Sequence, residues 1–161
     1  MATLGELSAV DAEAFVTTSV ASFIDDLVES GTDRNAATDA TDDYMRRLLP
    51  DGIRTKGHRF RSIRVEGREV GRLWFGPVRE SPGDWYLFEI DIDEAERGHG
   101  NGRAALQEVI SELDLPTTNR LGLNVFDSNS AAIALYESLG FKAGTDSTGG
   151  REMWREFRAR D

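Results

Sequence analysis

The sequence predicts an α/β domain in which one mixed sheet packs with helices on both of its faces. Two segments with helical apolar spacing come first, three strand-like segments follow, and helix and strand then alternate before two final strands. Helices and strands mixed in this order pack as layers around one core. The 161 residues show no repeat or linker and are 39% hydrophobic and 30% charged, so we expect a single domain over residues 1–161.

The first two helices are predicted from apolar spacing and from their end signals. Ser8, three residues before Asp11, is a typical N-cap, and Gly31 is expected to end this helix. A second helix is expected over about residues 34–49, with Pro50 at its end. The second helix is expected to turn Tyr44, Leu48 and Leu49 inward, and the apolar residues of the first helix are expected to fall on one stripe, namely Phe15, Val16, Val20, Phe23, Ile24, Leu27 and Val28.

The next segments change to the period of two that is typical of strands. Residues 59–66 and 69–75 alternate in polarity around a turn at Glu66-Gly67-Arg68, which predicts an antiparallel hairpin. A loop at Ser81-Pro82-Gly83 then leads into a strand over residues 85–92.

Helix and strand alternate over the last third of the chain. The spacing predicts a helix over residues 103–113, a strand over 121–126 and a short helix over 129–140. Phe141 and residues 151–157 are expected to contribute the final strands.

Three alternating glycines, Gly98, Gly100 and Gly102, stand between the strand over 85–92 and the helix that follows it. Without side chains, such residues let successive N–H groups turn toward one anion, and the start of a helix adds a partial positive charge. Arg97 adds a full positive charge. The segment is therefore suited to a diphosphate, although a tight connection without a ligand is the alternative.

Two common nucleotide motifs do not fit this segment. A Walker loop needs Gly-Lys-Ser/Thr, whereas Arg103 and Ala104 follow Gly102. The dinucleotide fingerprint G-x-G-x-x-G also fails, and no repeated βαβ pattern surrounds the glycines. The bound group is therefore expected to belong to another class of nucleotide.

Composition narrows the partners further. The net charge of −10 disfavours nucleic acid and anionic membrane partners and attracts cationic amines. The absence of cysteine and the presence of only His58 and His99 disfavour a metal site. Because the start MATLGELSAVDAEAF lacks the features of a signal peptide, we expect a cytoplasmic protein.

Two linked motifs resemble one known family. RGHGNG, residues 97–102, matches the R/Q-x-x-G-x-G/A signature of the GNAT superfamily of acyl-coenzyme A-dependent N-acyltransferases. LNVFDSNSAAIALYESLGF, residues 123–141, resembles its downstream N-x-x-A-x-x-L-Y-E-x-x-G-F element. The resemblance runs from Val70 to the C-terminus. It implies a mostly antiparallel sheet splayed at the coenzyme site, with residues 1–55 as variable helices on the acceptor side.

The resemblance also implies which residues bind the cosubstrate, acetyl-coenzyme A. The glycine segment would hold the pyrophosphate through backbone N–H groups, and the pantetheine would lie along the strand that precedes it. Asn129 would contact the coenzyme and cap its own helix. The implied set is Ile90, Asp91, Ile92, Arg97, Gly98, His99, Gly100, Asn101, Gly102, Arg103, Asn129 and Tyr136.

Two residues are expected to move protons. The tyrosine of the LYE element, Tyr136, would protonate the departing thiolate, and a phenol and a thiol titrate near about 10 and about 8.5. Glu89 is the first candidate for the base that deprotonates the amine, with Asp91 on the same strand face unless a bulge intervenes. His58, Trp74 and Tyr86 are further candidates on the acceptor side.

The activity implied is transfer of an acetyl group to a primary amine by direct attack through a tetrahedral intermediate. Relatives that acetylate protein N-termini carry a glutamate twelve residues before the tyrosine, where this sequence has Asn124. This difference favours a small-molecule amine. A protein N-terminal amine and a non-catalytic acyl-coenzyme A sensor are the alternatives, and a homodimer is an alternative to a monomer.

Overall fold

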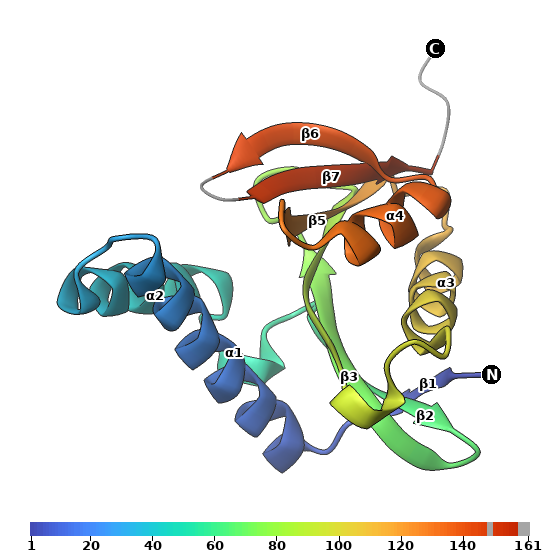
Figure 1. Ribbon diagram of the computed structural model, residues 1–161. Coiled ribbons are helices and arrows are strands. Elements are labelled where there is room, and N and C mark those ends of the chain that lie inside the picture. The colour runs from blue at the N-terminus through green and yellow to red at the C-terminus, as the bar shows by residue number, and fades with distance from the viewer. Residues whose placement is uncertain (148–149, 158–161) are drawn as a thin grey trace. The chain divides into compact units, whose positions relative to one another are not determined.

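The computed structural model describes residues 1–147 and 150–157, and the chain divides into two compact units. The sheet unit consists of Met1–Glu6 and the chain from Arg59 onward. The helical unit is Leu7–His58. Figure 1 shows the elements of both.

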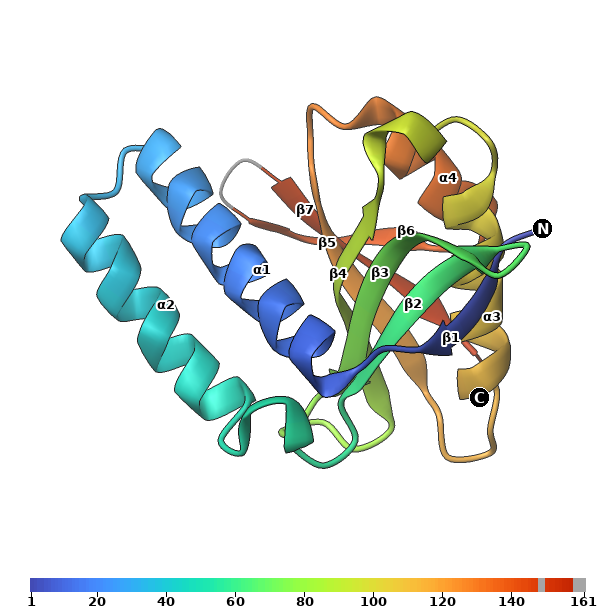
Figure 2. The same ribbon diagram turned by 90° about the horizontal axis from the view of Figure 1, so that it is seen from below.

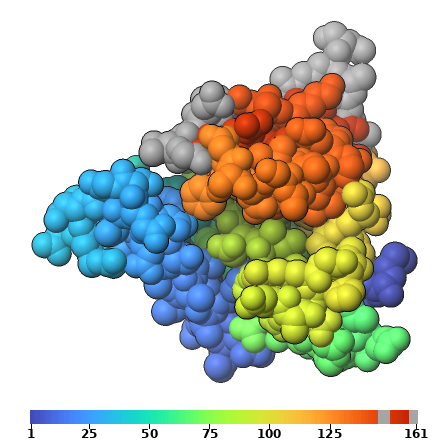
Figure 3. Space-filling view, viewed as in Figure 1, coloured from blue at the N-terminus to red at the C-terminus, as the bar shows by residue number. Residues whose placement is uncertain are grey.

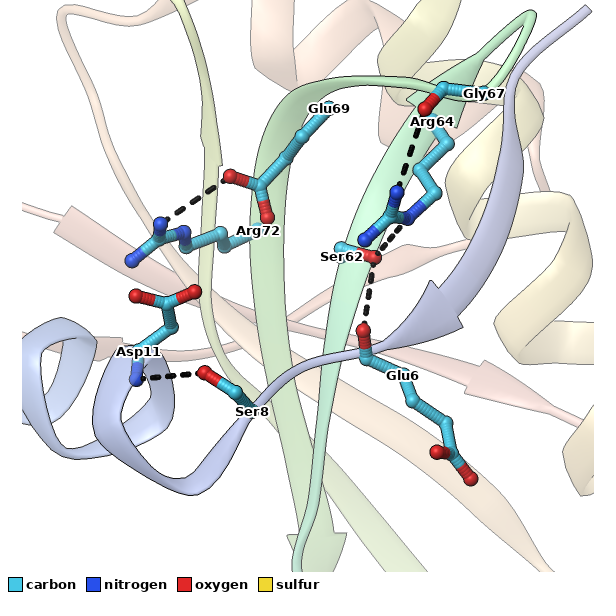
Figure 4. Close-up of polar contacts among 8 residues, drawn as sticks. All are labelled: Glu6, Ser8, Asp11, Ser62, Arg64, Gly67, Glu69 and Arg72. Atoms are coloured by element: carbon cyan, nitrogen blue, oxygen red, sulfur yellow. Dashed lines mark hydrogen bonds and ion pairs between the residues drawn. The ribbon is translucent and has the colours of Figure 1, made fainter.

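The helical unit contains α1 (Ala9–Glu29), α2 (Arg34–Leu48) and a short 3-10 turn, η1 (Gly52–Arg54). The predicted N-cap is confirmed, because the Ser8 hydroxyl accepts a hydrogen bond of 3.2 Å from the backbone N–H of Asp11 (Figure 4). Asp33 caps α2 in the same way by accepting from the N–H of Ala36.

The inward-facing side chains of these helices are only partly as expected. Phe15 and Leu49 are buried, but Tyr44 is 44% exposed, so its predicted inward position is wrong, and Phe23 on the apolar stripe of α1 is 47% exposed. Periodicity identifies the apolar side of a helix, but it does not say how far along the helix that side is covered.

The sheet has seven strands in the order β1-β2-β3-β4-β5-β7-β6. Every neighbouring pair is antiparallel except β4 and β5, which are parallel. This confirms the predicted mixed, mostly antiparallel sheet. The strands are β1 (Thr3–Glu6), β2 (Arg59–Val65), β3 (Arg68–Pro77), β4 (Asp84–Ile92), β5 (Arg120–Phe126), β6 (Lys142–Ser147) and β7 (Gly150–Glu156).

Strand β1 at one edge of the sheet was not predicted, because four residues are too few to show an alternating pattern. It pairs with β2, and the buried hydroxyl of Ser62 donates to the backbone oxygen of Glu6 at 3.2 Å (Figure 4). The predicted hairpin of β2 and β3 is present, with positive φ at Glu66 and Gly67 in its turn. Phe141 precedes β6 rather than belonging to it.

Helices α3 (Asn101–Leu113) and α4 (Ser130–Ser138) lie on the same face of the sheet (Figure 2). Helix α3 begins two residues earlier than predicted, at the end of the glycine segment. The core between these helices and the sheet contains Leu106, Val109, Leu113, Tyr136, Leu73, Phe75, Leu87, Leu121, Leu123 and Met153. We call this face of the sheet the core face.

A β-bulge in β4 changes which residues share a face. Trp74 pairs with Glu89 and Phe75 pairs with Leu87, so Phe88 has no partner on β3. Leu87 lies on the core face before the bulge, and Ile90 and Ile92 pack against the same core after it. Because neighbouring side chains alternate, Glu89 and Asp91 lie on the opposite face of the sheet.

Candidate active site

The parallel strands β4 and β5 separate soon after they begin. They pair only where Asp84–Tyr86 faces Arg120–Gly122, so Leu87–Ile92 and Leu123–Phe126 have no ladder between them. An opening of this kind leaves backbone groups of β4 available to another extended chain. The structure therefore contains the splay that the family resemblance implied.

The edge of β4 presents particular backbone groups to this opening. The N–H of Asp93 donates to the carbonyl oxygen of Val70 on β3, at 2.8 Å. Because antiparallel hydrogen bonds alternate in direction, the backbone groups of Ile92 and Ile90 point the other way, toward β5. Asp91 directs its backbone toward β3, and its carboxylate lies 3.5 Å from the guanidinium of Arg97.

The glycine segment lies where β4 ends and α3 begins. Gly98 and Gly100 have φ values of 81° and 78°, and a Cβ at either position would meet no atom within 4 Å. Gly100 is the N-cap residue of α3, and no side chain caps this helix end within the described residues. The first N–H groups of α3 are therefore free to donate to an anion, next to a backbone that side chains do not cover.

Three contacts hold this segment in place. Arg97 donates through Nε to the carbonyl oxygen of Ile92 at 2.9 Å, so part of its guanidinium anchors the loop. Asn101 is buried and donates through Nδ2 to the carbonyl oxygen of Glu96 at 3.1 Å. Arg68 on β3 pairs with the Glu96 carboxylate, and this hydrogen bond lowers the pKa of Glu96 below its ordinary value.

The remaining predicted coenzyme residues lie in the glycine segment and at the starts of α3 and α4. His99 and Arg103 are exposed, one in the glycine segment and the other in the first turn of α3. Asn129 caps α4 by accepting from the N–H of Ala132 at 3.2 Å, which leaves its amide nitrogen available. Figure 3 shows a hollow between the yellow loop that leads into α3 and the orange segment around α4, with the green strand region at its floor.

Tyr136 is buried in α4, with 8% of its surface exposed. Burial raises the pKa of its hydroxyl above the ordinary value, and the negative charge of Glu89 raises it further. These two side chains come from a strand and a helix that are far apart in sequence. Glu89 lies on the face of β4 opposite the core that contains Tyr136, so in this structure the two groups are related through the effect of the Glu89 charge on the phenol.

Sequence reasoning missed two features of this site. The bulge at Phe88 sets the face on which Glu89 lies, and no glycine or proline in β4 signals it. Gly122 is buried beneath the ring of Trp154, which a Cβ would approach to 2.6 Å. Its role depends on the pairing of β5 with β7, which the local sequence does not show.

Two further properties of residues 1–147 and 150–157 bear on the site. No group of three or more His, Cys, Asp or Glu side chains is arranged to hold a metal ion there. No helix in the same residues is long and apolar enough to span a membrane.

Comparisons with known proteins agree on one family. The model of the acetyltransferase (GNAT) family matches residues 22–141. The uncharacterised N-acetyltransferase YdgE of Bacillus subtilis (strain 168) is 28% identical over 146 residues, which are 86% of this chain and 90% of that protein. The ribosomal protein bS18 alanine N-acetyltransferase of Escherichia coli (strain K12) is 46% identical over 72 residues, which are 41% of this chain and 49% of that protein.

Solved structures share the fold. The crystal structure of YycN from Bacillus subtilis has a TM-score of 0.76 and 25% identity, over 91% of this chain and 95% of that one. The PaiA N-acetyltransferase of Thermoplasma acidophilum, crystallised with coenzyme A, has a TM-score of 0.65 and 14% identity, over 97% and 99% of the two chains. The chain belongs to the GNAT family of acetyltransferases, and it is an acyl-coenzyme A-dependent N-acyltransferase.

Proposed function

We propose that this protein transfers the acetyl group of acetyl-coenzyme A to the primary amine of a small molecule, by direct attack. One observation carries the proposal: the open edge of β4 leads directly into the uncapped start of α3, with a buried tyrosine beside it. The edge of β4 matches the extended pantetheine of the donor, and the start of α3 matches its pyrophosphate. The buried tyrosine matches the thiol.

Binding of the donor uses the backbone more than the side chains. The N–H groups at Gly98 to Arg103 and the start of α3 hold the pyrophosphate, and the charge of Arg103 contributes. The backbone groups of Ile90 and Ile92 pair with the pantetheine amides as a further strand would. Asn129 offers its amide nitrogen from the start of α4.

The reaction needs three proton movements that balance. An alkylammonium first loses a proton, because its pKa of about 10.4 leaves little free amine at pH 7. The amine nitrogen then bonds to the thioester carbon, and a backbone N–H of β4 stabilises the oxyanion. As the C–S bond breaks, the nitrogen loses its second proton and Tyr136 protonates the thiolate. Glu89, directly or through water, accepts the two protons of the amine one after the other and releases each to solvent.

The raised pKa of Tyr136 keeps its hydroxyl protonated at neutral pH, so it can donate a hydrogen bond to the emerging thiolate. The same shift widens the gap to a thiol, whose pKa is about 8.5, so it makes the phenol a weaker acid toward the thiolate. After the proton transfer, Tyr136 is reprotonated from solvent before the next turnover.

Two classes of acceptor are supported by different observations, a protein N-terminal amine and a small-molecule amine. The bS18 alanine N-acetyltransferase matches 72 residues at 46% identity, which favours a protein N-terminal amine. Asn124 favours a small molecule, because an amide side chain cannot take up a proton as the glutamate of N-terminal acetyltransferases does. The net charge of −10 also favours a cationic small amine.

The donor is tested by thermal unfolding with acetyl-coenzyme A, coenzyme A, NAD and ATP in parallel. A ligand at 100 times its dissociation constant adds about 2.7 kcal/mol to the free energy of unfolding. We expect this stabilisation with the two coenzyme A compounds alone. Stabilisation by NAD or ATP instead would contradict the assignment of the glycine segment.

The acceptor is tested by thiol release with aliphatic amines and with a peptide that begins with alanine. We expect turnover with an amine. Turnover with the peptide alone would establish the competing function, and stabilisation by acetyl-coenzyme A without any turnover would indicate a sensor.

A further inference from the structure

Aromatic side chains form a continuous row on the face of the sheet opposite the core face. Phe60 stacks on Trp74 at 5.3 Å between ring centroids, and Trp74 stacks on Phe88 at 4.8 Å. Phe88 lies 5.3 Å from Tyr86, whose ring lies 5.8 Å from that of Trp154. The row therefore crosses from β2 to β7 and passes the point where β4 and β5 separate.

A carboxylate lies at the β7 end of this row. Glu152 Oε1 accepts from the indole N–H of Trp154 at 2.9 Å, and Oε2 lies 3.5 Å from the hydroxyl of Tyr86. Both of these partners are neutral. Glu152 is partly buried and pairs across the strands with Asn124 of β5.

The charge of Glu152 is compensated less than that of comparable carboxylates in the sheet unit. Asp84, Glu69 and Glu112 are also buried or partly buried, and each forms an ion pair with arginine. Glu152 has no ion pair with lysine or arginine in the part of the chain that the structure describes. Arg120, whose guanidinium lies 3.7 Å from the centroid of Trp154, has Asp84 as its carboxylate partner. A partly desolvated carboxylate held by neutral donors favours a mobile cation.

The position of Glu152 relates it to the reaction. Tyr86 is the last residue of β4 that pairs with β5, and Glu89 lies three residues further along β4, in the splay. At about 3.3 Å per residue, less the shortening at the bulge, Glu89 lies about 7 to 10 Å along β4 from Tyr86, which Glu152 contacts. The rings of Tyr86 and Phe88 lie along this stretch, where they can contact methylene groups and cations.

We infer that Glu152 selects acceptors that carry a second positive charge, namely short aliphatic diamines. The inference rests on the proposed function, because it places the reacting amine in the splay. One amino group is acetylated there, while the other stays protonated and binds the carboxylate of Glu152. The rings of Tyr86 and Phe88 contact the aliphatic chain. Glu152 touches the substrate but takes no part in the proton transfers.

The test compares 1,5-diaminopentane with pentylamine and 5-amino-1-pentanol, which have the same chain length and one charge less. We expect kcat/KM for the diamine to exceed that of the other two by about 10-fold or more, which is the size of one hydrogen bond to a charged group. Glu152→Gln is expected to reduce this ratio to about 1 by raising the KM of the diamine. The kcat/KM of pentylamine is expected to stay the same.

The control is Glu6→Gln, which makes the same change of charge on the edge strand at the other end of the sheet. In Glu6→Gln, the ratio of kcat/KM for the diamine to kcat/KM for the two monoamines is expected to stay at its wild-type value. An equal loss for all three amines in Glu152→Gln would overturn the inference, because a general base would behave in that way. Equal rates for the three amines in the wild type would also overturn it, while leaving the proposed function intact.

Two other outcomes concern the function itself. If the wild type acetylates no amine although acetyl-coenzyme A stabilises it, the proposed function fails and the inference fails with it. Transfer only to an alanine peptide would overturn the inference as well, because the acceptor would then be a protein.

Discussion

At the scale of single residues, Tyr136 joins a structural role to a chemical one. Its ring is part of the core between α4 and the sheet, and its hydroxyl has a raised pKa. Tyr136→Phe keeps the ring and removes the proton donor. We expect kcat to fall by about 10²-fold or more, with an unchanged dissociation constant for coenzyme A. Stopped-flow thiol release and calorimetry measure the two quantities.

The control for this substitution is Tyr44→Phe, which makes the same change in the helical unit at a residue that is 44% exposed. It is expected to leave kcat unchanged. If Tyr136→Phe kept the wild-type kcat, the tyrosine would have no part in the mechanism. Water would then protonate the departing thiolate.

The raised pKa of Tyr136 also predicts an effect on stability at alkaline pH. The folded protein keeps the phenolic proton at pH values where the unfolded chain, with a pKa of about 10, has begun to lose it. The stabilisation is therefore complete below pH 10 and is lost as the pH rises through the folded-state pKa. Denaturant unfolding between pH 8 and 11 should show a smaller alkaline loss for Tyr136→Phe than for the wild type.

Gly122 shows what a missing side chain contributes. A Cβ at this position would lie 2.6 Å from the ring of Trp154, which is itself fixed by Glu152 and Arg120. Gly122→Ala is expected to lower the free energy of unfolding by about 1 to 3 kcal/mol, as overpacking does. Urea unfolding measures the change.

Gly102→Ala is the matched control, because its Cβ would meet only Leu135, at 3.7 Å, within the first turn of α3. It is expected to raise stability by up to about 1 kcal/mol through helix propensity. Equal effects of the two substitutions would show that Trp154 moves aside.

At the scale of elements, Asn129 has both a capping and a binding role. Asn129→Ala removes the hydrogen bond to the N–H of Ala132 and is expected to cost about 1 kcal/mol of stability. Asn129→Asp keeps a capping oxygen but places a negative charge near the proposed coenzyme phosphates. We expect it to retain wild-type stability and to bind coenzyme A more weakly than the alanine variant does. If Asn129→Asp bound coenzyme A more tightly than Asn129→Ala, Asn129 would not lie near the phosphates of the coenzyme.

The sequence predicts elements best where local signals and family motifs coincide. The glycine segment, α3 and α4 follow from Gly98 to Gly102 and from the LYE element, because helix ends and tight loops depend on neighbouring residues. The bulge at Phe88 could not be predicted, because it depends on the pairing of β3 with β4. The neighbourhood of Glu152 depends on Tyr86, 66 residues away in the chain.

At the scale of the whole molecule, the excess of acidic residues predicts a response to salt. A net charge of −10 concentrates cationic acceptors around the protein, and the Debye length falls to about 10 Å at 0.1 M salt. With saturating acetyl-coenzyme A, the KM of an amine should therefore rise between about 20 and 200 mM NaCl while kcat stays constant. A neutral osmolyte at matched osmolality is the control, and a KM independent of NaCl would contradict long-range attraction.

The short pairing between β4 and β5 divides the sheet into two halves that are each nearly continuous in sequence. Apart from β1, the first half comes from residues 59–92, and the second comes from residues 120–156. Contacts within each half are mostly local, and local contacts form quickly. The halves can therefore order independently during folding, and α3 is the chain that joins them. A donor bound between β4 and β5, as proposed above, would contact both halves of the sheet, so its binding is expected to hold together two parts that few strand hydrogen bonds connect.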